Sequence, residues 1–564
     1  MASAPLVLEP QPNSDESTIT APFRYIGNFH KTLPHDGAGH VDVTAYQKFV
    51  DIAAEGNFES VAEGMITGGQ PHVAKLINPQ CGRATDTEGP DPLRVEMQPA
   101  PGVLSQSAAA EMTELQWMAW LRDLNFDTWG GSPDVGTAIS ELNTRFKPAL
   151  SEADPGHLMA QLDIPTMADG VTPDINLQTL FRAGLKGEDA GPLVSQFMLL
   201  DCDYGAQRIE QTMIPYRAGA DYLTALPEWL VAQDTGYDKY GHDYLSDNNY
   251  GSDPSYYPNP LARVRIRNMR DLARFVNRDA LHQAYFNAAL QLLSWGAPVG
   301  SGNPYTGYVR QLGFGTLGGP NLLALVTEVA SRALKVVWRQ KWLVHRRLRP
   351  EAYGGLMHNQ FDNSAPTNYG LPAWLPDTAV SKNLFARNQT HLFPIAYSAG
   401  SPAHPSYGAG HASVAGACVT ILKAWFADVS FQSVIAKASA PSKDPSLPPQ
   451  ILQPGTNRLD GSLPPYSGAD IGDMTVHGEL NKLAANVALG RSMGGVHWRS
   501  DNTRSLRLGE RVAIVILRRS MPTYPEGPLS LSFVNFDREM VTIDHSGEVT
   551  VAGNQPLTDW FNSF

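Results

Sequence analysis

The stretch from Pro320 to Pro350 constrains the fold more than any other part of the sequence. Its letters, PNLLALVTEVASRALKVVWRQKWLVHRRLRP, repeat apolar residues at helical spacing over many turns. Proline is tolerated in the first turn of a helix but ends one further along, so we expect a single helix from Pro320 to about Arg349. Its apolar half must face a core, and its last turns are basic.

Further helices and a few strands extend this expectation. Apolar residues recur at helical spacing over 46–53 and 272–293. The stretch 439–473 is rich in Pro, Ser, Gly and Asp, which indicates a long surface excursion before helix resumes around Glu479. Near the C-terminus, MVTIDHSGEVTV (540–551) alternates apolar and polar residues around a Ser-Gly turn and predicts a small hairpin. The sequence therefore predicts a mainly α protein with small β-hairpins.

Composition excludes several classes of protein. At 564 residues the chain can bury one very large core or a few smaller ones. Its 43 basic and 56 acidic residues give a formal charge of −13, which argues against a nucleic-acid binder. Any site that binds an anion must therefore be a local concentration of positive charge on an acidic protein. Cys81, Cys202 and Cys418 form no CxxC pair and are too few for a disulfide framework, although they leave room for one disulfide.

Neither secretion nor membrane insertion is indicated. The first 23 residues contain no Lys or Arg and lack an apolar core, so we expect an extended arm and no signal peptide. The longest apolar run, 412–422, is roughly half of what a bilayer-spanning helix requires. We expect a soluble protein, cytoplasmic by default, with no membrane partner.

Three clusters of residues point to an oxyanion, and the first is the basic end of the long helix. It contains Lys341, His345, Arg346, Arg347 and Arg349. In a continuous helix Lys341 and His345 share one face and Arg349 lies about 80 degrees from Lys341, so two fixed cations can point into one cavity. The alternative is a solvated basic helix end, stabilised by the helix macrodipole.

The second cluster is SPAHPSYGAGHASVAGACVTILKAWF, which starts at Ser401. His404, Gly408, Gly410 and His411 lie where a loop becomes a helix N-terminus, which offers unpaired backbone N–H groups to an anion. Glycine permits close approach of the anion to the backbone. The two histidines could equally be ordinary capping and core groups.

The third cluster is ELNKLAANVALGRSMGGVHWRSDN, in which Arg491, His497 and Asp501 form the pattern R-x5-H-x3-D. We expect a helix to end near Gly494 and Gly495, so that Arg491 and His497 reach one cavity from opposite sides of a turn. Asp501 could then hydrogen-bond His497, which fixes the tautomer and makes the other ring nitrogen a better nucleophile or metal ligand.

In this order the three clusters resemble the vanadium-dependent haloperoxidases, most closely the bromoperoxidases of marine algae and their bacterial relatives. The similar stretches are GFGTLGGPNLLALVTEVASRALKVVWRQKW, HRRLRPEAYGGL, HPSYGAGHASVAGACVTILKAWF and GRSMGGVHWRSD. The resemblance is clear from roughly residue 260 to 520. It implies a fold with two four-helix bundles that flank a vanadate site. It also implies that the protein oxidises bromide with hydrogen peroxide to hypohalous acid, which then halogenates small organic acceptors. Iodide is a further expected substrate, and chloride a less favoured one.

The resemblance also implies roles for single residues. His497 would be the axial ligand of vanadium(V), and the equatorial oxygens would be held by Lys341, Arg349, Arg491 and the N–H of Gly410. His411 would be the acid–base, and Lys341 would polarise the peroxide. His404 matches a second histidine of the bromide-oxidising branch, where it is thought to tune bromide reactivity, and Asp501 would support His497.

Two positions depart from, or vary within, the family pattern. A serine usually precedes the Gly-His pair and bonds a vanadate oxygen, whereas this chain has Ala409. Losing one such hydrogen bond costs roughly 1.5 to 3 kcal/mol, so weaker vanadate binding or an altered halide preference would follow. Trp338 stands three residues before Lys341. This position is Arg in some algal enzymes and Trp in others, so we expect the preference for bromide, iodide or chloride to differ between branches.

Four other functions compete with this interpretation. An acid phosphatase could use the same clusters, with His497 as a phosphohistidine and His411 protonating the leaving alcohol. A non-catalytic oxyanion store would not need the histidine–acid pair. A zinc hydrolase is disfavoured because HExxH is missing and the cations would repel zinc. The literal GxGxxG beginning at Gly313 follows no convincing strand and predicts a helix entry rather than a dinucleotide site.

The resemblance also implies a larger organisation. We expect a helical N-terminal part with an extended arm (1–260), a catalytic bundle carrying the vanadate site (261–525) and a C-terminal tail with a short hairpin (526–564). The relatives are dimers or dodecamers, so we expect a homo-oligomer. Acidic segments such as DNNYGSDPSYYPNP (247–260) could bind structural calcium, as red-algal relatives do.

Overall fold

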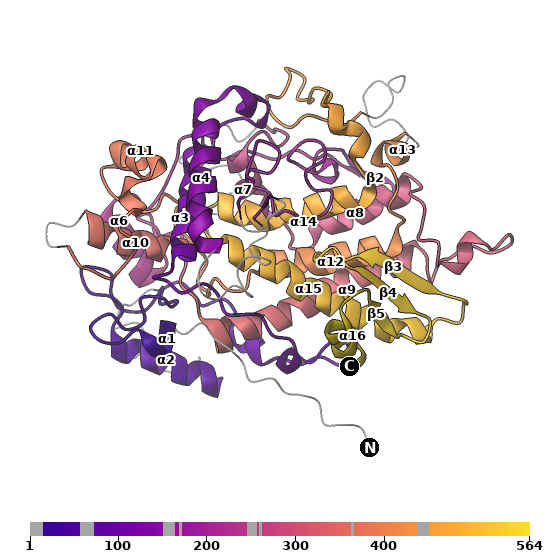
Figure 1. Ribbon diagram of the computed structural model, residues 1–564, viewed down its shortest axis with the longest axis horizontal. Helices are drawn as coiled ribbons and strands as arrows, with labels where there is room; N and C mark the ends of the chain where they lie inside the picture. The colour runs from indigo at the N-terminus through magenta and orange to yellow at the C-terminus, as the bar shows by residue number, and fades with distance from the viewer. Residues whose placement is uncertain are drawn as a thin grey trace.

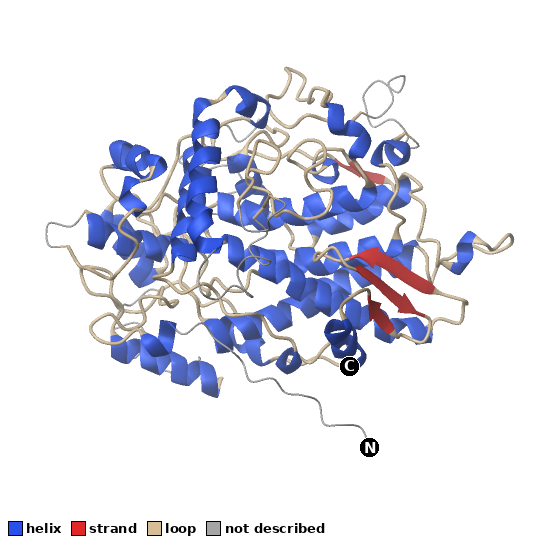
Figure 2. Cartoon of the chain, in the orientation of Figure 1, coloured by secondary structure: helices blue, strands red, loops and turns tan. Residues whose placement is uncertain are grey.

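Helices dominate the computed structural model, which describes residues 15–56, 73–150, 164–167, 172–244, 256–258, 262–362, 366–436 and 450–564 (Figure 2). The predicted mainly α class is thereby confirmed. The α-helices are α1 (Asp15–Thr18), α2 (Val43–Glu55), α3 (Gln106–Trp120), α4 (Pro133–Leu150), α6 (Leu226–Thr235), α7 (Met269–Arg278), α8 (Gln283–Ser294), α9 (Gly319–Arg339), α10 (Pro350–Phe361), α11 (Ala379–Asn388), α12 (Gly410–Trp425), α13 (Phe431–Ile435), α14 (Val476–Met493), α15 (Arg499–Ser520) and α16 (Gln555–Asn562).

Short turns of other helix types connect these elements. One is π-helical, η8 (Gln340–His345), and directly continues α9. The others are the 3-10 turns η3 (Pro79–Arg83), η4 (Pro92–Arg94), η5 (Phe126–Gly131), η6 (Gln196–Met198), η7 (Pro304–Thr306), η9 (Leu375–Asp377), η10 (Ala469–Asp473) and η11 (Met521–Thr523).

A four-helix bundle of α9, α12, α14 and α15 forms the centre of the molecule (Figure 1). Every residue of α12 except His411 is buried, and α12 packs most extensively on α15. Glycine makes this close approach possible. A Cβ at Gly416 would lie 1.9 Å from the Leu506 carbonyl oxygen, and one at Gly509 would lie 1.9 Å from the Ser413 carbonyl oxygen.

Other helices extend the same hydrophobic core. The stretch 272–293 forms helix as predicted but in two pieces, α7 and α8, of which α7 packs on α14. The helix predicted over 46–53 is α2, whose N-terminus is capped by the Asp42 side chain accepting from Ala45 N. On the left in Figure 1, α3 packs against α4 and α11 and also contacts α14.

The predicted C-terminal hairpin is confirmed and belongs to a three-stranded antiparallel sheet, in the order β3 (Ser530–Val534), β4 (Met540–Asp544), β5 (Val549–Val551). A buried charge pair fastens this sheet to the bundle. Lys423 Nζ of α12 donates to Val534 O at 2.9 Å and lies 3.7 Å from Glu510 of α15. A second sheet pairs β1 (Cys202–Tyr204) with β2 (Gln207–Ile209).

Several peripheral predictions meet the structure only in part. From Asp15 onward the expected arm instead packs on the body, with Asp15 buried and Glu16 paired to Arg346 at 2.7 Å. Residues 439–449 of the excursion and most of the acidic segment 247–260 lie outside the described residues, whereas 450–473 is irregular apart from η10, as expected. All three cysteines are free thiols. Within the described ranges, no helix combines the length and apolarity needed to cross a membrane.

Candidate active site

The predicted long helix does not reach Arg349. It is α-helical as far as Arg339 and then widens into the π-helical turn η8. Arg346 follows with a left-handed conformation, φ +40°, and its N–H donates to the Lys341 carbonyl. Arg349 is the N-cap of the next helix, α10. The expectation of one continuous helix was therefore wrong, and Arg349 approaches the site from a different element.

An N-terminal segment causes this break. Phe29 N donates to Arg346 O at 2.8 Å, and Leu348 N donates to Gly27 O at 3.1 Å. These contacts hold the chain between η8 and α10 in extended form, and a helix cannot continue through residues whose backbone groups pair with another segment. The sequence near Pro350 gave no sign of a partner more than 300 residues away.

Lys341 is fully buried at the start of η8. Its Nζ donates to Pro405 O at 2.9 Å and Ser406 O at 3.1 Å, and lies 5.5 Å from the centre of the Trp338 ring. An ammonium group carries three protons, so one remains for a ligand. Burial, followed by repulsion from Arg349, lowers the pKa of Lys341 well below its usual value.

Arg349 connects the first cluster to the other two. Its Nε donates to His404 O at 2.9 Å and its Nη2 lies 2.9 Å from His404 Nδ1. Its Nη1 donates to Val496 O at 2.6 Å and lies 3.1 Å from His497 Nε2. Burial and the nearby Arg491 lower the pKa of Arg349 to about 9. Burial and neighbouring cations also keep the pKa of His404 well below its usual value, which favours its neutral form.

The second cluster forms the N-terminus of α12, with Gly410 as its first residue. A Cβ at Gly410 would lie 3.0 Å from Trp338 Cζ3, so glycine lets the helix end approach the tryptophan. Ala409 is the N-cap; its methyl group cannot cap the helix, and its own N–H donates to Ser505 Oγ at 2.8 Å. The first N–H groups of a helix have no intrahelical acceptor and can bind an anion.

His411 has a carboxylate partner that sequence reasoning missed. Its Nε2 lies 2.9 Å from Asp279 Oδ1, just beyond the end of α7. Asp279 is buried, whereas the His411 side chain is 18% exposed, so the imidazole is the part of the pair that solvent reaches. The two residues are 132 positions apart, and no local pattern around Asp279 marks it.

The third cluster has the predicted geometry. His497 Nδ1 lies 2.9 Å from Asp501 Oδ2, which also accepts from Trp498 N at 3.0 Å. Asp501 Oδ1 accepts from Arg347 Nη1 at 2.8 Å. A proton on Nδ1 then donates to Asp501 and leaves a lone pair on Nε2. Arg349 Nη1 donates to that lone pair here, so a ligand bound at Nε2 would take the place of this contact. Burial, followed by repulsion from Arg349 and other cations, keeps the pKa of His497 well below its usual value.

A second carboxylate, also missed by sequence reasoning, supports this pair from α3. Glu111 Oε2 accepts from Ser500 N and Ser500 Oγ, each at 2.8 Å, and Glu111 Oε1 lies 3.5 Å from Arg347 Nη2. Arg347 therefore lies between two buried carboxylates, Glu111 and Asp501, and its charge is used structurally. It is not a cation available to a ligand.

Arg491 is also buried, and its charge lowers the pKa values of Lys341 and Arg349. Its Nη1 donates to Tyr244 OH at 2.5 Å and Val276 O at 2.9 Å, and its guanidinium lies 5.9 Å from the Tyr397 ring centre. Burial acts to lower its pKa, but Tyr244 and Tyr397 raise it overall. Its Nε is buried and has no hydrogen-bond partner in the described part of the chain.

Of the aromatic residues near the motifs, Trp338 lies in the cluster itself. Its ring is 5.2 Å from that of His404, and its Nε1 donates to Ile77 O at 3.1 Å. The others have packing roles: Trp342 joins a small separate cluster that includes Phe29, Tyr407 hydrogen-bonds Gln98 O, and Trp498 hydrogen-bonds Leu348 O.

The cluster has an excess of positive charge that suits an oxyanion. Lys341, Arg349 and Arg491 are buried together, and no carboxylate in the described residues forms an ion pair with any of them. The acids that act electrostatically on these cations are already paired: Asp279 with His411, Asp501 with His497, and Glu351 with Lys31. The unpartnered Nε of Arg491 and the free α12 N–H groups fit the oxygens of vanadate or phosphate. No three His, Cys, Asp or Glu side chains among the described residues are grouped to hold a metal cation.

Comparison with known proteins identifies the family. The domain family described as VCPO second helical-bundle domain matches residues 321–524. The vanadium-dependent bromoperoxidase of Corallina pilulifera is 32% identical over 89% of this chain and 88% of its own length. That of Ascophyllum nodosum is 31% identical over 96% of this chain and 90% of its own length.

A solved structure gives the same result. A homohexameric vanadate-dependent bromoperoxidase from Ascophyllum nodosum superposes with a TM-score of 0.74 at 30% identity, covering 96% of this chain and 88% of that one. The three motif clusters lie within the matched length of these relatives, and the fold and the sequence agree. The chain belongs to the vanadium-dependent bromoperoxidase family.

Proposed function

We propose that this chain oxidises bromide with hydrogen peroxide, using vanadate held between Lys341, Arg349, Arg491 and His497. The observation that carries the proposal is the group of three buried cations without carboxylate partners in the described residues, beside His497 Nε2, whose lone pair accepts from the Arg349 guanidinium. Burying such charge without compensation is costly, so the arrangement favours a bound anion. Membership of the bromoperoxidase family supports vanadate as that anion.

The residues divide into holding and proton-handling groups. Lys341, Arg349, Arg491 and the Gly410 N–H would hold the oxygens of vanadate, and His497 Nε2 would coordinate the vanadium. When bound, vanadium(V) would supply a Lewis acid that makes peroxide electrophilic enough to accept halide attack. Lys341 would contribute its third N–H, because two carbonyl oxygens already accept from the other two.

His411 is the proposed acid–base, with Asp279 orienting it. The carboxylate contact at Nε2 orients the ring and leaves Nδ1 as the exchanging nitrogen. The exposure of His411 gives it access to water and peroxide, whereas His404 and His497 are more deeply buried. The His411 side chain can therefore accept a proton from peroxide and later return it to the departing hypohalite.

His404 and Trp338 are proposed to set halide preference. Their rings contact each other at an angle of 41°, and Lys341 Nζ lies 5.5 Å from the centre of the Trp338 ring. The Arg349 guanidinium fixes His404 through two contacts. A neutral imidazole and an indole form a soft, weakly hydrated wall that suits bromide or iodide better than the more strongly hydrated chloride. The hypohalous acid then halogenates small organic acceptors.

An acid phosphatase remains the alternative, because His497 Nε2 could also attack phosphorus. The two functions are distinguished by assaying metal-free protein for bromination of a chromogenic acceptor, with and without orthovanadate, and for phosphate-ester hydrolysis in parallel. Bromination that appears only with vanadate supports the bromoperoxidase. Hydrolysis that vanadate inhibits, without any bromination, would overturn it.

Some finer features also belong to this proposal. We propose that the chain forms a homo-oligomer, because the solved relative is a homohexamer; the dimer and dodecamer first expected are alternative sizes. Calcium in the acidic segment, the division at residues 260 and 525, and a cytoplasmic location stay predictions. Mass determination in solution and metal analysis of the purified protein test the first two.

A further inference from the structure

A loop at residues 307–316, here called the projecting loop, exposes an unusual amount of apolar surface. Val309 is 96% exposed, Leu312 91% and Phe314 74%. In Figure 1 the segment between α8 and α9 extends from the right side of the body into solvent. Single exposed apolar residues are common on proteins, but three large ones within six positions form a patch that indicates a binding surface.

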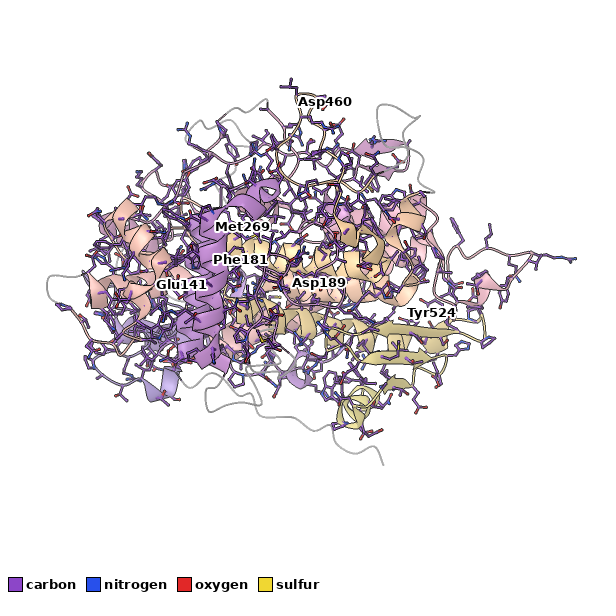
Figure 3. The ribbon with its side chains drawn as sticks, turned by 45° about the horizontal axis from the view of Figure 1, so that its top comes forward. Glu141, Phe181, Asp189, Met269, Asp460 and Tyr524 are labelled. Carbon is purple, nitrogen blue, oxygen red and sulfur yellow. The ribbon has the colours of Figure 1, made fainter. Side chains whose placement is uncertain are left out.

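The base of the projecting loop is fixed. Tyr305 OH donates to Glu526 Oε1 at 2.8 Å, and the Thr316 hydroxyl donates to the same oxygen. Leu317 N donates to Asn321 Oδ1 at 3.1 Å. Tyr524, labelled in Figure 3, donates to that same Asn321 oxygen at 3.0 Å, so the loop leaves the body beside the C-terminal sheet.

The end of the projecting loop, residues 313–318, turns back on itself too closely for side chains at Gly313 and Gly318. A Cβ at Gly313 would lie 2.5 Å from Leu317 O, and one at Gly318 would lie 2.4 Å from Phe314 N. The glycines first noticed as a GxGxxG pattern thus close a tight turn. The apolar side chains therefore extend from a rigid backbone. A rigid loop loses less conformational entropy when a partner binds to it.

We propose that the projecting loop docks onto a second copy of this chain. The inference rests on the homo-oligomer proposed above, since the solved structure that matches 96% of this chain is a homohexamer. Between Tyr308 and Phe314 the only charged residue is Arg310, which suits the surface of a chain whose formal charge is −13. The same net charge disfavours an anionic lipid surface as the partner.

The loop would be an anchor rather than the whole interface. Three such side chains present roughly 400 Å² of apolar surface, about half of the 800 Å² that each partner contributes to a standard interface. Interfaces of this kind concentrate their binding energy in a few well-buried apolar side chains. Flanking parts of the surface must supply the rest of the contact.

The test is a triple variant, Val309→Ser, Leu312→Ser and Phe314→Ser, in the full-length protein. Sedimentation velocity and light scattering over a range of concentrations should show the dissociation constant of the oligomer rising about 100-fold or more. The matched control is Leu459→Ser with Met540→Ser, two exposed apolar residues elsewhere, which should assemble like the wild type. An unchanged melting temperature shows that the variant folds.

The proposal is overturned if the triple variant assembles like the wild type, or if the wild type is a monomer at every concentration. Flotation of the wild type, but not the variant, with phosphatidylcholine or phosphatidylserine vesicles would assign the loop to a lipid surface instead. Vanadate-dependent bromination, followed in the same samples, tests the catalytic proposal separately, because the loop contains none of the proposed site residues.

Discussion

Four lysines are buried in the described part of the chain, and they fall into two kinds. Lys31 lies 2.8 Å from Glu351, Lys482 lies 2.5 Å from Glu479, and Lys423 lies 3.7 Å from Glu510. Lys341 Nζ donates to two carbonyl oxygens and forms no ion pair with a carboxylate of the described residues. Three are therefore structural ion pairs, whereas the fourth carries a charge that the folded chain leaves unbalanced.

The contrast shows how an anion site differs from an ordinary buried ion pair. Lys423 and Lys341 belong to neighbouring helical elements, and burial lowers the pKa of both. Around Lys423 the balancing charge is part of the chain and anchors the C-terminal sheet. The charges that act on Lys341 are Arg349, Asp501 and Arg491. Asp501 is already shared by His497 and Arg347, so the balance of charge requires a ligand. Variants at the two kinds of lysine, and at residues around the site, test this difference.

His497→Ala should abolish function at the unbalanced site. With vanadate in excess we expect the bromination rate to fall by on the order of a thousandfold or more, because the proposed axial ligand is lost. Equilibrium dialysis should show only a partial loss of vanadate binding, since the cations remain. Turnover near that of the wild type would exclude His497 as the ligand.

Replacing each of the two lysines by methionine compares them directly. Lys341→Met should weaken vanadate binding by about 100-fold, as expected for the loss of a buried charge-assisted contact. Lys423→Met should leave the affinity within about a factor of two. Dialysis against orthovanadate measures both, and equal losses would show that the two lysines are not of different kinds.

The same two variants should shift stability in opposite directions when vanadate is absent. Lys341→Met should stabilise the protein by about 1 kcal/mol, because it removes an uncompensated buried charge. Lys423→Met should destabilise it by about 3 kcal/mol at pH 8, because Glu510 loses its partner. Urea unfolding at fixed pH gives both values.

The cost of Lys423→Met should depend on pH. Burial raises the pKa of Glu510 to about 7, above its unfolded value, so the folded protein binds the extra proton and stability is lost as pH rises through 7. At pH 5 Glu510 is largely protonated and needs no cation. The destabilisation should therefore shrink between pH 8 and pH 5, and a pH-independent loss would contradict the assignment.

Asp279→Asn tests a carboxylate near the site whose hydrogen-bond partner is a histidine, His411, and not a lysine or arginine. The bromination rate should fall about tenfold, because the His411 ring loses the carboxylate that orients it. Vanadate affinity should change little. A large loss of vanadate affinity would mean that Asp279 maintains the fold around the anion.

Ala409→Ser should have the smallest effect, strengthening vanadate binding by up to about tenfold through one added hydrogen bond or shifting halide preference. A serine there can also cap α12, so unfolding of the vanadate-free variant must be measured as the control. Tighter vanadate binding beyond any gain in stability isolates the new contact. Unchanged affinity and halide preference would show that the missing hydroxyl is unimportant here.

The sequence alone was enough to predict the mainly helical class, several helices of the central core and the C-terminal hairpin. These depend on apolar periodicity and on Pro and Gly positions, which act over a few residues. It also placed Asp501 four residues after His497, and their contact follows from the geometry of a short turn and one helix start. The order of the three clusters was enough to indicate the family.

How the charges around these motifs are balanced depends on contacts that the tertiary structure makes and that the sequence did not predict. The break before Arg349 depends on backbone pairing with residues 27–29, the partner of His411 comes from the end of α7, and Arg347 is neutralised by Glu111 from α3. Each contact joins residues more than 100 positions apart, and no local pattern encodes it. A basic motif by itself cannot show whether its charges are paired, because the paired acids are brought in by packing, and that pairing is what separates Lys341 from the other buried lysines.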